Sequence, residues 1–269
     1  MTRVQSFLKW AGGKRWLVSR EDQNLFNIEC NRYVEPFLGG GSIYFRMSPK
    51  QAILADVNKD LIMTYRAIKN DWLKIQNRLA KHQKKHSKKY YYQERNKKYS
   101  KNIDKAAQLI YLNRTCWNGL YRVNKNGVFN VPKGTKRKVV LKNDNFKAIS
   151  EVLKGAKLIH SDFEKVIAQT VEGDFLFVDP PYTIKHGNNG FIKYNEKIFK
   201  WKDQERLCRS LAKAHKKKVK IFMTNAYHKD IRALYKKIGF TCEPITRASV
   251  IAGKSSARGK YKELIIKNY

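Results

Sequence analysis

Acidic residues are scarce in this sequence, which has 22 Asp and Glu against 57 Lys and Arg and a formal net charge of +35. A lysine bias inherited from an AT-rich genome explains Lys in place of Arg, but it does not explain so few carboxylates. So large an excess of positive charge indicates a polyanionic partner. Nucleic acid is our first expectation. An anionic membrane surface is a weaker alternative, because no basic amphipathic helix with a strong apolar face stands out.

Long apolar runs are absent as well. No stretch reaches about 18 apolar residues, so we expect no membrane-spanning helix. The first residues, MTRVQSFLKWAGGK, lack the apolar core of a secretory signal, which favours a cytoplasmic protein. The chain has 269 residues, 42% of them apolar, which is enough for one large domain or for a domain with an inserted subdomain.

Cysteine is sparse and scattered, at Cys30, Cys116, Cys208 and Cys242. No C-x-x-C pair is present, so neither a zinc ribbon nor a disulfide framework is indicated, and we expect reduced thiols. His82 and His86 are spaced to share one helix face, but they lie in KHQKKHSKK, a cationic run that would repel a metal ion. We therefore expect both histidines on the solvated surface and no metal site.

Short apolar segments alternate with segments of helical spacing. The apolar segments that predict strands buried on both faces are 33–37, 52–56, 157–163, 175–179 and 219–225. The helical spacing is clearest at Leu207, Leu211 and Ala214, and again at Ile231, Leu234, Tyr235 and Ile238. This alternation predicts an α/β fold in which helices cover a doubly wound, mostly parallel sheet.

Residues 58–157 interrupt the alternation, because they are rich in Lys and Tyr and mainly helical in pattern. The stretch is too long for a simple crossover between two strands. We therefore expect one domain formed by residues 1–57 and 158–269, and an inserted helical domain formed by residues 58–157.

Near the end of the insertion, LYRVNKNGVFNVP predicts a β-hairpin, at about residues 118–134. Segments 120–123 and 128–131 flank a turn in which Asn126-Gly127 suits a positive φ. The side chains that such a hairpin can bring into a DNA groove are Tyr121, Arg122, Asn124 and Lys125. Most hairpins are only scaffolding, so this pattern alone does not establish DNA binding.

A glycine loop follows the first predicted strand, in EPFLGGGS (residues 35–42). Glycines at this place permit a tight turn and close approach of a ligand to the backbone. No Lys-Ser or Lys-Thr follows, so the loop is not a Walker A loop. The next predicted strand ends in Asp56, where doubly wound folds commonly place a carboxylate that accepts hydrogen bonds from ribose hydroxyls. Together these features indicate an adenosyl or dinucleotide ligand.

The stretch FLFVDPPY (residues 175–182) ends a buried strand in a carboxylate, two prolines and what we expect to be an exposed aromatic ring. The prolines have fixed φ and no N–H, so the carbonyls of this corner are held rigid. The Asp179 carboxylate and a neighbouring carbonyl suit the two N–H donors of an exocyclic amino group. Tyr182 offers a flat face for a planar base. Alone, the stretch is equally well explained as a loop that caps a strand; behind the glycine loop and Asp56, a nucleobase site is favoured.

The sequence resembles the amino-group methyltransferases that use S-adenosylmethionine, through the motif pair EPFLGGGS and DPPY. The order of the motifs, with an insertion between them, is similar to the alpha class of N6-adenine DNA methyltransferases, in particular the Dam-type (D12) family. The segments FLKWAGGK, LADVN and LNRTCWNGLYRVNKNGVFNVPKG also resemble that family. The likeness runs from Phe7 to the C-terminus. It implies a Rossmann-like methyltransferase sheet with an inserted target-recognition subdomain.

The resemblance also implies roles for individual residues. Its catalytic positions match Asp179, Pro180, Pro181 and Tyr182. Its positions for S-adenosylmethionine match Trp10, Lys14, Phe37, Gly39, Gly41, Asp56, Asp162 and Asp179. Its DNA-contacting positions match Lys9, Trp117, Asn118, Leu120, Arg122, Asn124 and Pro132. Trp117 stands where Tyr is common. Tyr194 and Phe199 fall in a loop on the adenine side.

The implied reaction moves the sulfonium methyl of S-adenosylmethionine to adenine N6, whose lone pair is delocalised into the ring. We expect Asp179 and the Pro180 carbonyl to accept both N6 protons and so localise that lone pair. An adenine inside a duplex cannot reach the corner, so base flipping is expected, with Trp117 filling the gap. Lys9 and Arg122 match positions that read guanines, and GATC is the expected site.

Other functions remain open from the sequence. RNA adenine and protein glutamine methyltransferases have similar corners, although many carry Asn at the first position. A DNA-binding relative without catalysis is disfavoured by the intact DPPY and glycine loop. The sequence does not distinguish a lone methylase from a restriction-modification partner or a phage enzyme. We take a monomer as the default.

Overall fold

The computed structural model describes residues 4–19, 26–124, 127–183, 199–248 and 260–269. The chain forms two compact units. Unit 1 comprises Met1–Phe26, Gly39–Pro49 and Asn58–His160, and unit 2 comprises Asn27–Leu38, Lys50–Val57 and Ser161–Tyr269. Residues 58–157 all fall within unit 1. The domain boundaries expected from the sequence stay a prediction.

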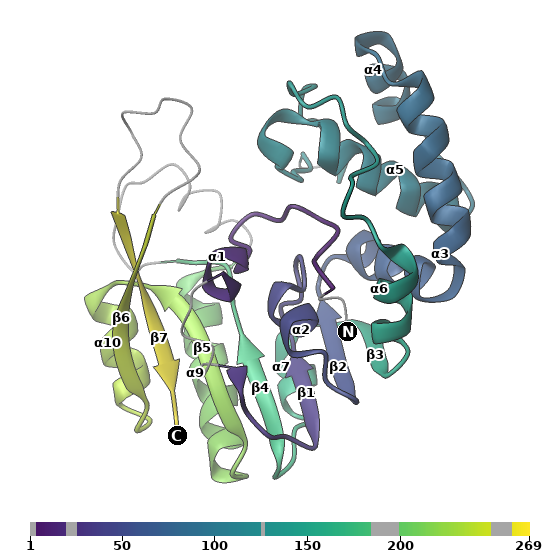
Figure 1. The fold of residues 1–269 in the computed structure, drawn as a ribbon. Coiled ribbons are helices and arrows are strands. Elements are labelled where there is room, and N and C mark those ends of the chain that lie inside the picture. The colour runs from purple at the N-terminus through teal and green to yellow at the C-terminus, as the bar shows by residue number, and fades with distance from the viewer. Residues whose placement is uncertain (1–3, 20–25, 125–126, 184–198, 249–259) are drawn as a thin grey trace. The chain divides into compact units, whose positions relative to one another are not determined.

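Unit 2 is built on a mixed β-sheet (Figure 1). Its described strands are β1 (Arg32–Glu35), β2 (Ala52–Asp56), β4 (Asp174–Val178), β5 (Lys220–Ala226), β6 (Thr241–Ala248) and β7 (Lys260–Lys267). They follow the order β2-β1-β4-β5-β7-β6, in which β2, β1, β4 and β5 run parallel. β7 is antiparallel to both β5 and β6. The predicted α/β fold with a mostly parallel sheet is confirmed.

The apolar strand sequences explain the burial of this sheet. All five residues of β4 are buried, as are Tyr33, Val34 and Glu35 of β1. Parallel strands of this kind need helices over their faces. Helix α7 (Phe163–Ile167) packs on β2, α9 (Trp201–Lys216) on β5 and α10 (Lys229–Lys236) on β6. The first predicted helical stripe is confirmed, since α9 buries Leu207, Leu211 and Ala214. The second is confirmed in part, since α10 buries Ile231 and Tyr235, whereas Leu234 is half-buried and Ile238 lies beyond the end of the helix.

The prediction for residues 157–163 is wrong in two respects. Strand β3 (Ala156–His160), in unit 1, alternates buried and exposed positions, so it is not buried on both faces. It also ends at His160, and helix α7 begins at Phe163. The carboxylate of Asp162 accepts a hydrogen bond from the Glu164 N–H at 2.9 Å, so this residue is the N-cap of α7.

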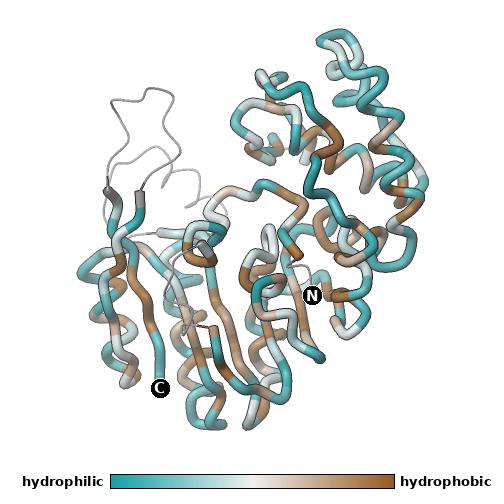
Figure 2. The backbone as a smooth tube through the Cα atoms, in the orientation of Figure 1, coloured by the Kyte–Doolittle hydropathy of each residue, from teal (hydrophilic) through white to brown (hydrophobic). Residues whose placement is uncertain are grey.

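Unit 1 is mainly helical. Its described α-helices are α1 (Arg15–Val18), α2 (Ser42–Met47), α3 (Lys59–Lys85), α4 (Lys88–Asn96), α5 (Asn102–Thr115) and α6 (Phe146–Leu153). The Asn58 side chain caps α3, and the backbone departs from helical geometry at Asp71. α3 packs against α5 and α6 and buries Leu61, Tyr65, Ile68, Ile75 and Leu79 at helical spacing. Figure 2 shows long hydrophilic stretches on α3 and α4 and hydrophobic residues gathered along the strands.

The predicted hairpin is present only in part. Asn124 N–H donates to the Val128 carbonyl at 2.8 Å, and an antiparallel bridge joins Val123 to Phe129. Gly127 has the positive φ expected of it, +72°, whereas residues 125–126 lie outside the described ranges. The two sides meet through single bridges instead of two continuous strands. A second antiparallel bridge, between Cys116 and Lys133, joins the two ends of the segment that contains this turn.

The prediction that both histidines lie on the solvated surface is wrong for His82, which is only 6% exposed, whereas His86 is half-buried. The His82 ring stacks on Tyr111 with centroids 4.8 Å apart, and its Nδ1 lies 2.9 Å from the Tyr90 hydroxyl. His86 Nδ1 lies 2.9 Å from the Tyr111 hydroxyl. The lysines of this run are exposed while the histidines face the aromatic core.

In the described ranges no group of three His, Cys, Asp or Glu side chains is arranged to bind a metal. None of the described helices has the length and hydrophobicity needed to cross a bilayer.

Candidate active site and DNA interface

The DPPY corner lies at the carboxyl end of β4 in unit 2. Asp179 directly follows the buried strand, and Pro180 is buried. Because β5 runs parallel to β4 with Met223 opposite Val178, Thr224 lies next to Asp179. The Thr224 hydroxyl donates to Asp179 Oδ1 at 2.7 Å. The position of this carboxylate is therefore fixed by the sheet and by a side-chain hydrogen bond.

Tyr182 is half-buried, so the expectation of an exposed ring is wrong. Its hydroxyl donates to Glu263 Oε2 at 2.7 Å, and Glu263 on β7 also pairs with Arg247 on β6. Burial is the first cause that raises the pKa of Tyr182 well above its ordinary value; the charges of Asp179 and Glu263 follow. The phenol therefore stays protonated and holds the ring in place. Sequence reasoning gave no role to Glu263, because it lies 81 residues from Tyr182 in the chain.

Glu35 is a second feature that sequence reasoning missed. It ends β1 and is 2% exposed, and its Oε2 accepts a hydrogen bond from the Tyr33 hydroxyl at 2.8 Å. Burial raises the pKa of the Glu35 carboxyl well above its ordinary value, and the Asp179 and Asp56 carboxylates raise it further. The parallel strands β1, β2 and β4 thus bring three carboxyl groups to one edge of the sheet. The available signal was a Glu at the end of an otherwise apolar strand.

The aromatic rings of Phe37, Phe163 and Phe199 meet in unit 2. Phe37 stacks on Phe163 at 5.3 Å between centroids and meets Phe199 edge-on at 5.8 Å. The Arg206 guanidinium lies 4.5 Å from the Phe163 centroid. Two predicted residues, Phe37 and Phe199, are therefore brought together. Tyr194 lies outside the described residues.

Asp162 lies at the first turn of α7 and pairs with Arg206 of α9. Arg206 Nη2 lies 2.5 Å from Asp162 Oδ2, and the same guanidinium pairs with Glu164 at 3.0 Å and with Asp203 at 3.1 Å. The hydrogen bond to Asp162 is the main reason that the pKa of Arg206 is raised. Asp162 is thus oriented by a neighbour that the sequence pattern did not indicate.

The glycine loop and the KWAGGK segment meet in unit 1. Gly39 has φ +48°, and a Cβ there would lie 2.9 Å from Trp10 Cδ1, so this close approach needs glycine. Gly41 is the N-cap of α2. The Trp10 ring also stacks on the ring of Tyr121, with centroids 5.3 Å apart. Lys14 is 3% exposed, and its Nζ donates to the Gly12 carbonyl at 2.6 Å.

The predicted DNA-contacting residues lie in unit 1 on irregular backbone. Trp117 and Asn118 lie in the short 3-10 helix η2 (Trp117–Gly119), where Trp117 is 52% exposed and Asn118 has φ +55°. Lys9 is exposed, Leu120 is half-buried, and the exposed Pro132 accepts a hydrogen bond from Trp117 N–H at 2.9 Å through its carbonyl.

The hairpin side chains support the turn itself. Arg122 Nε donates to Asn130 Oδ1 at 3.2 Å, and Asn124 Oδ1 accepts a hydrogen bond from the Val128 N–H at 3.0 Å. Arg122 is half-buried and Asn124 is exposed. Two of the predicted DNA-contacting side chains therefore have intramolecular partners, which hold them in a defined arrangement.

Comparison with known proteins identifies the family. Residues 10–250 match the family described as D12 class N6 adenine-specific DNA methyltransferase. The chain is 35% identical to the type II methyltransferase M1.LlaDCHI of Lactococcus lactis subsp. cremoris, over 99% of this chain and 96% of that protein. It is also 35% identical to the type II methyltransferase M.MjaIII of Methanocaldococcus jannaschii, over 99% of each chain.

A DNA adenine methylase of Escherichia coli strain K12 is 27% identical, over 98% of this chain and 95% of that protein. The family match covers most of the chain and includes the glycine loop, the DPPY corner and residues 117–132, where most of the predicted DNA-contacting residues lie. The resemblance inferred from the motifs is thereby confirmed at the level of the family, and the chain belongs to the D12 class N6 adenine-specific DNA methyltransferases.

Proposed function

We propose that this adenine-specific DNA methyltransferase takes its methyl group from S-adenosylmethionine and places it on N6 of an adenine flipped out of duplex DNA, within the sequence GATC. Family membership gives the action on adenine N6 in DNA. The methyl donor, the flipped base and the recognition sequence are the proposal. The observation that carries it is the fixed Asp179 carboxylate, followed by two prolines, at the carboxyl end of β4.

The corner fits the chemistry of an amino group that must become a nucleophile. The Asp179 carboxylate and the Pro180 carbonyl are acceptors, and they would take the two N6–H donors of the adenine. Such hydrogen bonds localise the N6 lone pair, which attacks poorly while it is delocalised into the ring. Because Thr224 and the buried strand hold Asp179 before the base arrives, little reorganisation is needed in the transition state.

Tyr182 would pack its ring against the flipped adenine. Its hydroxyl is anchored to Glu263, and its raised pKa keeps the phenol neutral at physiological pH. An anchored neutral ring provides a stacking face at low entropic cost. This contact would offset part of the few kcal/mol that unstacking an adenine costs.

The residues present fit an adenosyl cofactor. Unit 2 supplies the Asp56 carboxylate for ribose hydroxyls, the Asp162 carboxylate for an amino group and the apolar ring of Phe37, which stacks on Phe163. In unit 1, the family resemblance assigns Trp10, Lys14 and the glycines of residues 39–41 to S-adenosylmethionine, and Trp10 lies against Gly39. S-adenosylmethionine, when bound, would supply an electrophilic methyl group. The chain's own part is to hold the donor and to accept hydrogen bonds from the two N6–H groups.

DNA affinity and DNA specificity would come from different residues. The excess of lysine and arginine gives sequence-independent attraction to phosphates, which falls steeply with salt. Base reading requires a few placed side chains. We assign it to Lys9 and Arg122 for the guanines of GATC, with Trp117 filling the gap left by the flipped adenine. Asn118, Leu120, Asn124 and Pro132 would contact the DNA beside them.

The test of the catalytic assignment is Asp179→Asn in a single-turnover methyl-transfer assay. Asn keeps an oxygen that can accept the Thr224 hydrogen bond, but it loses the negative charge that strengthens the hydrogen bond from adenine N6–H. We expect the rate to fall by about 10²- to 10³-fold, as for loss of one preorganised hydrogen-bonding group. The temperature of unfolding and the affinity for GATC duplexes should change little.

Glu172→Gln is the matched control, because it also removes one carboxylate from unit 2. Glu172 precedes the amino end of β4 and forms an exposed ion pair with Lys218 at 3.3 Å. Its rate should equal that of the wild type. If Asp179→Asn retained transfer within a few-fold of the wild type, the proposed mechanism would be wrong.

Three further assignments belong to this proposal. We place the enzyme in the cytoplasm, where the chromosomal or phage DNA that it modifies is found. We assign it as a monomer, because one chain contains every predicted catalytic and reading residue. The similarity to proteins named type II methyltransferases supports a role in modifying restriction sites.

A further inference from the structure

The side chain of Asn113 joins two separate segments that carry predicted DNA-reading residues. Asn113 lies in the last turn of α5 and is fully buried. Its Oδ1 accepts a hydrogen bond from Lys9 N–H at 3.0 Å, and its Nδ2 donates to the Lys9 carbonyl at 2.7 Å. The same Nδ2 lies 3.3 Å from the Gly119 carbonyl. One amide therefore holds both backbone groups of residue 9 and one of residue 119.

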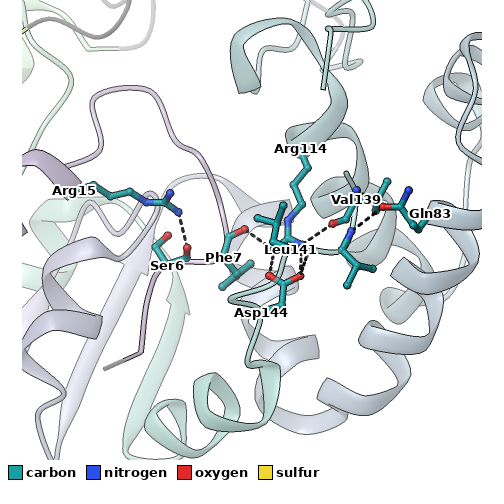
Figure 3. A network of polar contacts seen from close by, with 9 residues as sticks. Ser6, Phe7, Arg15, Gln83, Arg114, Val139, Leu141 and Asp144 are labelled. Carbon is teal, nitrogen blue, oxygen red and sulfur yellow. Dashed lines mark hydrogen bonds and ion pairs between the residues drawn. The ribbon is translucent and has the colours of Figure 1, made fainter. Parts of the chain in front are cut away.

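The next residue of α5 strengthens this attachment. Arg114 Nη2 donates to the Phe7 carbonyl at 3.1 Å, and the guanidinium makes two hydrogen bonds of 2.7 Å to the Asp144 carboxylate. Figure 3 shows this network, in which Arg15 also donates to the Ser6 carbonyl. The backbone before Lys9 is thus held by side chains over several consecutive residues. The exposed Lys9 side chain starts from a fixed point.

Gly119 brings the two segments into direct contact. It has φ +65°, and a Cβ at this position would lie 2.6 Å from Lys9 Cδ. The stem of Lys9 therefore packs on the backbone of the segment that carries Trp117 and Arg122. The stack of Trp10 on Tyr121 adds a second contact between the same segments. Lys9 and residues 117–122 form one composite surface, although more than 100 residues separate them in the chain.

We propose that Asn113 is a positioning residue for base recognition, which sets Lys9 against the 117–122 segment so that both read one target sequence. The inference rests on the proposed function, specifically on guanine reading by Lys9. Asn113 is fully buried and contacts no DNA itself. It acts by fixing the origin of the Lys9 side chain. A buried amide that satisfies three backbone groups is difficult to replace, since each unpaired group would be left without solvent.

The experiment compares methyl transfer by Asn113→Ala, Lys9→Ala and the double variant on GATC duplexes and on duplexes with each guanine replaced. Asn113→Ala should lower the discrimination at the guanine read by Lys9 by about tenfold, a typical loss for a misplaced base contact. In the Lys9→Ala background the same substitution should lower it no further. Calorimetric affinity for S-adenosylmethionine should stay unchanged.

Asn143→Ala is the matched control, because Asn143 Nδ2 also donates to the N-terminal segment, at Gln5 Oε1 and 3.0 Å, but does not touch Lys9. It should leave discrimination unchanged. If Asn113→Ala fails to fold, Asn113→Ser is used, whose hydroxyl can still donate or accept a hydrogen bond and buries no charge. That variant should show a smaller loss at the same guanine.

Three results would overturn the inference. If a folded Asn113→Ala variant discriminates between GATC and the substituted duplexes as well as the wild type does, Asn113 has no positioning role. Equal further losses in the wild-type and Lys9→Ala backgrounds would show that Asn113 acts on stability alone. If Lys9→Ala prefers GATC over the substituted duplexes as strongly as the wild type does, Lys9 reads no guanine, and Asn113 has no base contact to position. In each case methylation of GATC by the wild type would keep the proposed function intact, whereas its absence would remove both.

Discussion

The proposed catalytic corner of unit 2 (residues 179–182) and the proposed reading segment of unit 1 (Lys9 with residues 117–122) are held in place by different means. Asp56 and Asp179 lie at the carboxyl ends of parallel strands, so backbone hydrogen bonds of the sheet fix them. Lys9 and Gly119 lie on irregular backbone that the Asn113 side chain holds, and Arg114 holds the nearby carbonyl of Phe7. On the proposed function, the chemistry would rest on the sheet itself, whereas recognition would depend on buried polar residues such as Asn113 and Arg114.

The largest effect is expected where the support of the reading segment is broken. Arg114 and Asp144 form an ion pair with side chains only 5% and 10% exposed. Arg114→Ala would leave the Asp144 carboxylate buried and unpaired, so we expect unfolding to become easier by about 3–5 kcal/mol. The measurement is the urea midpoint of the full chain, together with discrimination between GATC and substituted duplexes.

A less buried ion pair of the same unit provides the control, with the Asp104 side chain 17% exposed. Arg78 Nε lies 2.7 Å from Asp104 Oδ1, with the arginine side chain 44% exposed. Arg78→Ala should cost about 0–1 kcal/mol and leave discrimination unchanged. Equal losses for the two variants would contradict the view that the buried network supports the reading segment.

A smaller effect is expected from the reading residue itself. Arg122→Ala should relax the preference at one guanine by about 1–3 kcal/mol, the usual value of a bidentate contact, without changing stability. Competition between GATC and singly substituted duplexes measures it. Arg209→Ala, which removes an exposed arginine of α9, should weaken DNA binding uniformly or not at all. Discrimination that is intact in Arg122→Ala would show that Arg122 does not read the base.

The smallest expected effects concern how stability depends on pH, which should run in opposite directions in the two units. Burial lowers the pKa of His82 from 6.5, so the folded state binds its proton less readily than the unfolded chain. The stability that neutral His82 gives unit 1 is present above pH 6.5 and is lost as the pH falls below it. Burial raises the pKa of Glu35 above 4.5, so its contribution to unit 2 is present below pH 4.5 and is lost as the pH rises.

Two substitutions separate these contributions in urea unfolding at a series of pH values. His82→Gln should reduce the loss of stability on acidification below pH 6.5. Glu35→Gln should reduce the loss on raising the pH above 4.5. If the stability of a variant changes with pH in the same way as that of the wild type, the pH dependence does not come from the substituted residue, and the assigned cause is wrong.

The sheet and its carboxyl edge could be predicted because their signals are local. The apolar run before Asp179, the glycine loop and Asp56 each mark the end of a strand within a few residues of sequence. The predictions failed where a distant partner decides the outcome. His82 lies in a run of lysines, yet Tyr90 and Tyr111 bury it. Asp162 lies just after a strand but caps a helix and pairs with Arg206 of another helix.

The supporting residues of the site were beyond sequence reasoning for the same reason. Asn113 is 104 residues from Lys9, and Glu263 is 81 residues from Tyr182. Glu35 belongs to the glycine-loop motif, but the sequence gives it no role, because its burial depends on three strands. The family motifs predict which residues meet the substrates. The fold was needed to find the residues that hold them.

The most direct test of the account is methyl transfer from labelled S-adenosylmethionine to duplexes that contain GATC, single-base variants of it, or no such site, at two salt concentrations. The account predicts label on adenine N6 that is restricted to GATC, with affinity for all duplexes falling as salt rises. Label spread over many adenines would contradict the assignment of base reading to Lys9 and Arg122. No label on any DNA would contradict the proposed function as a whole.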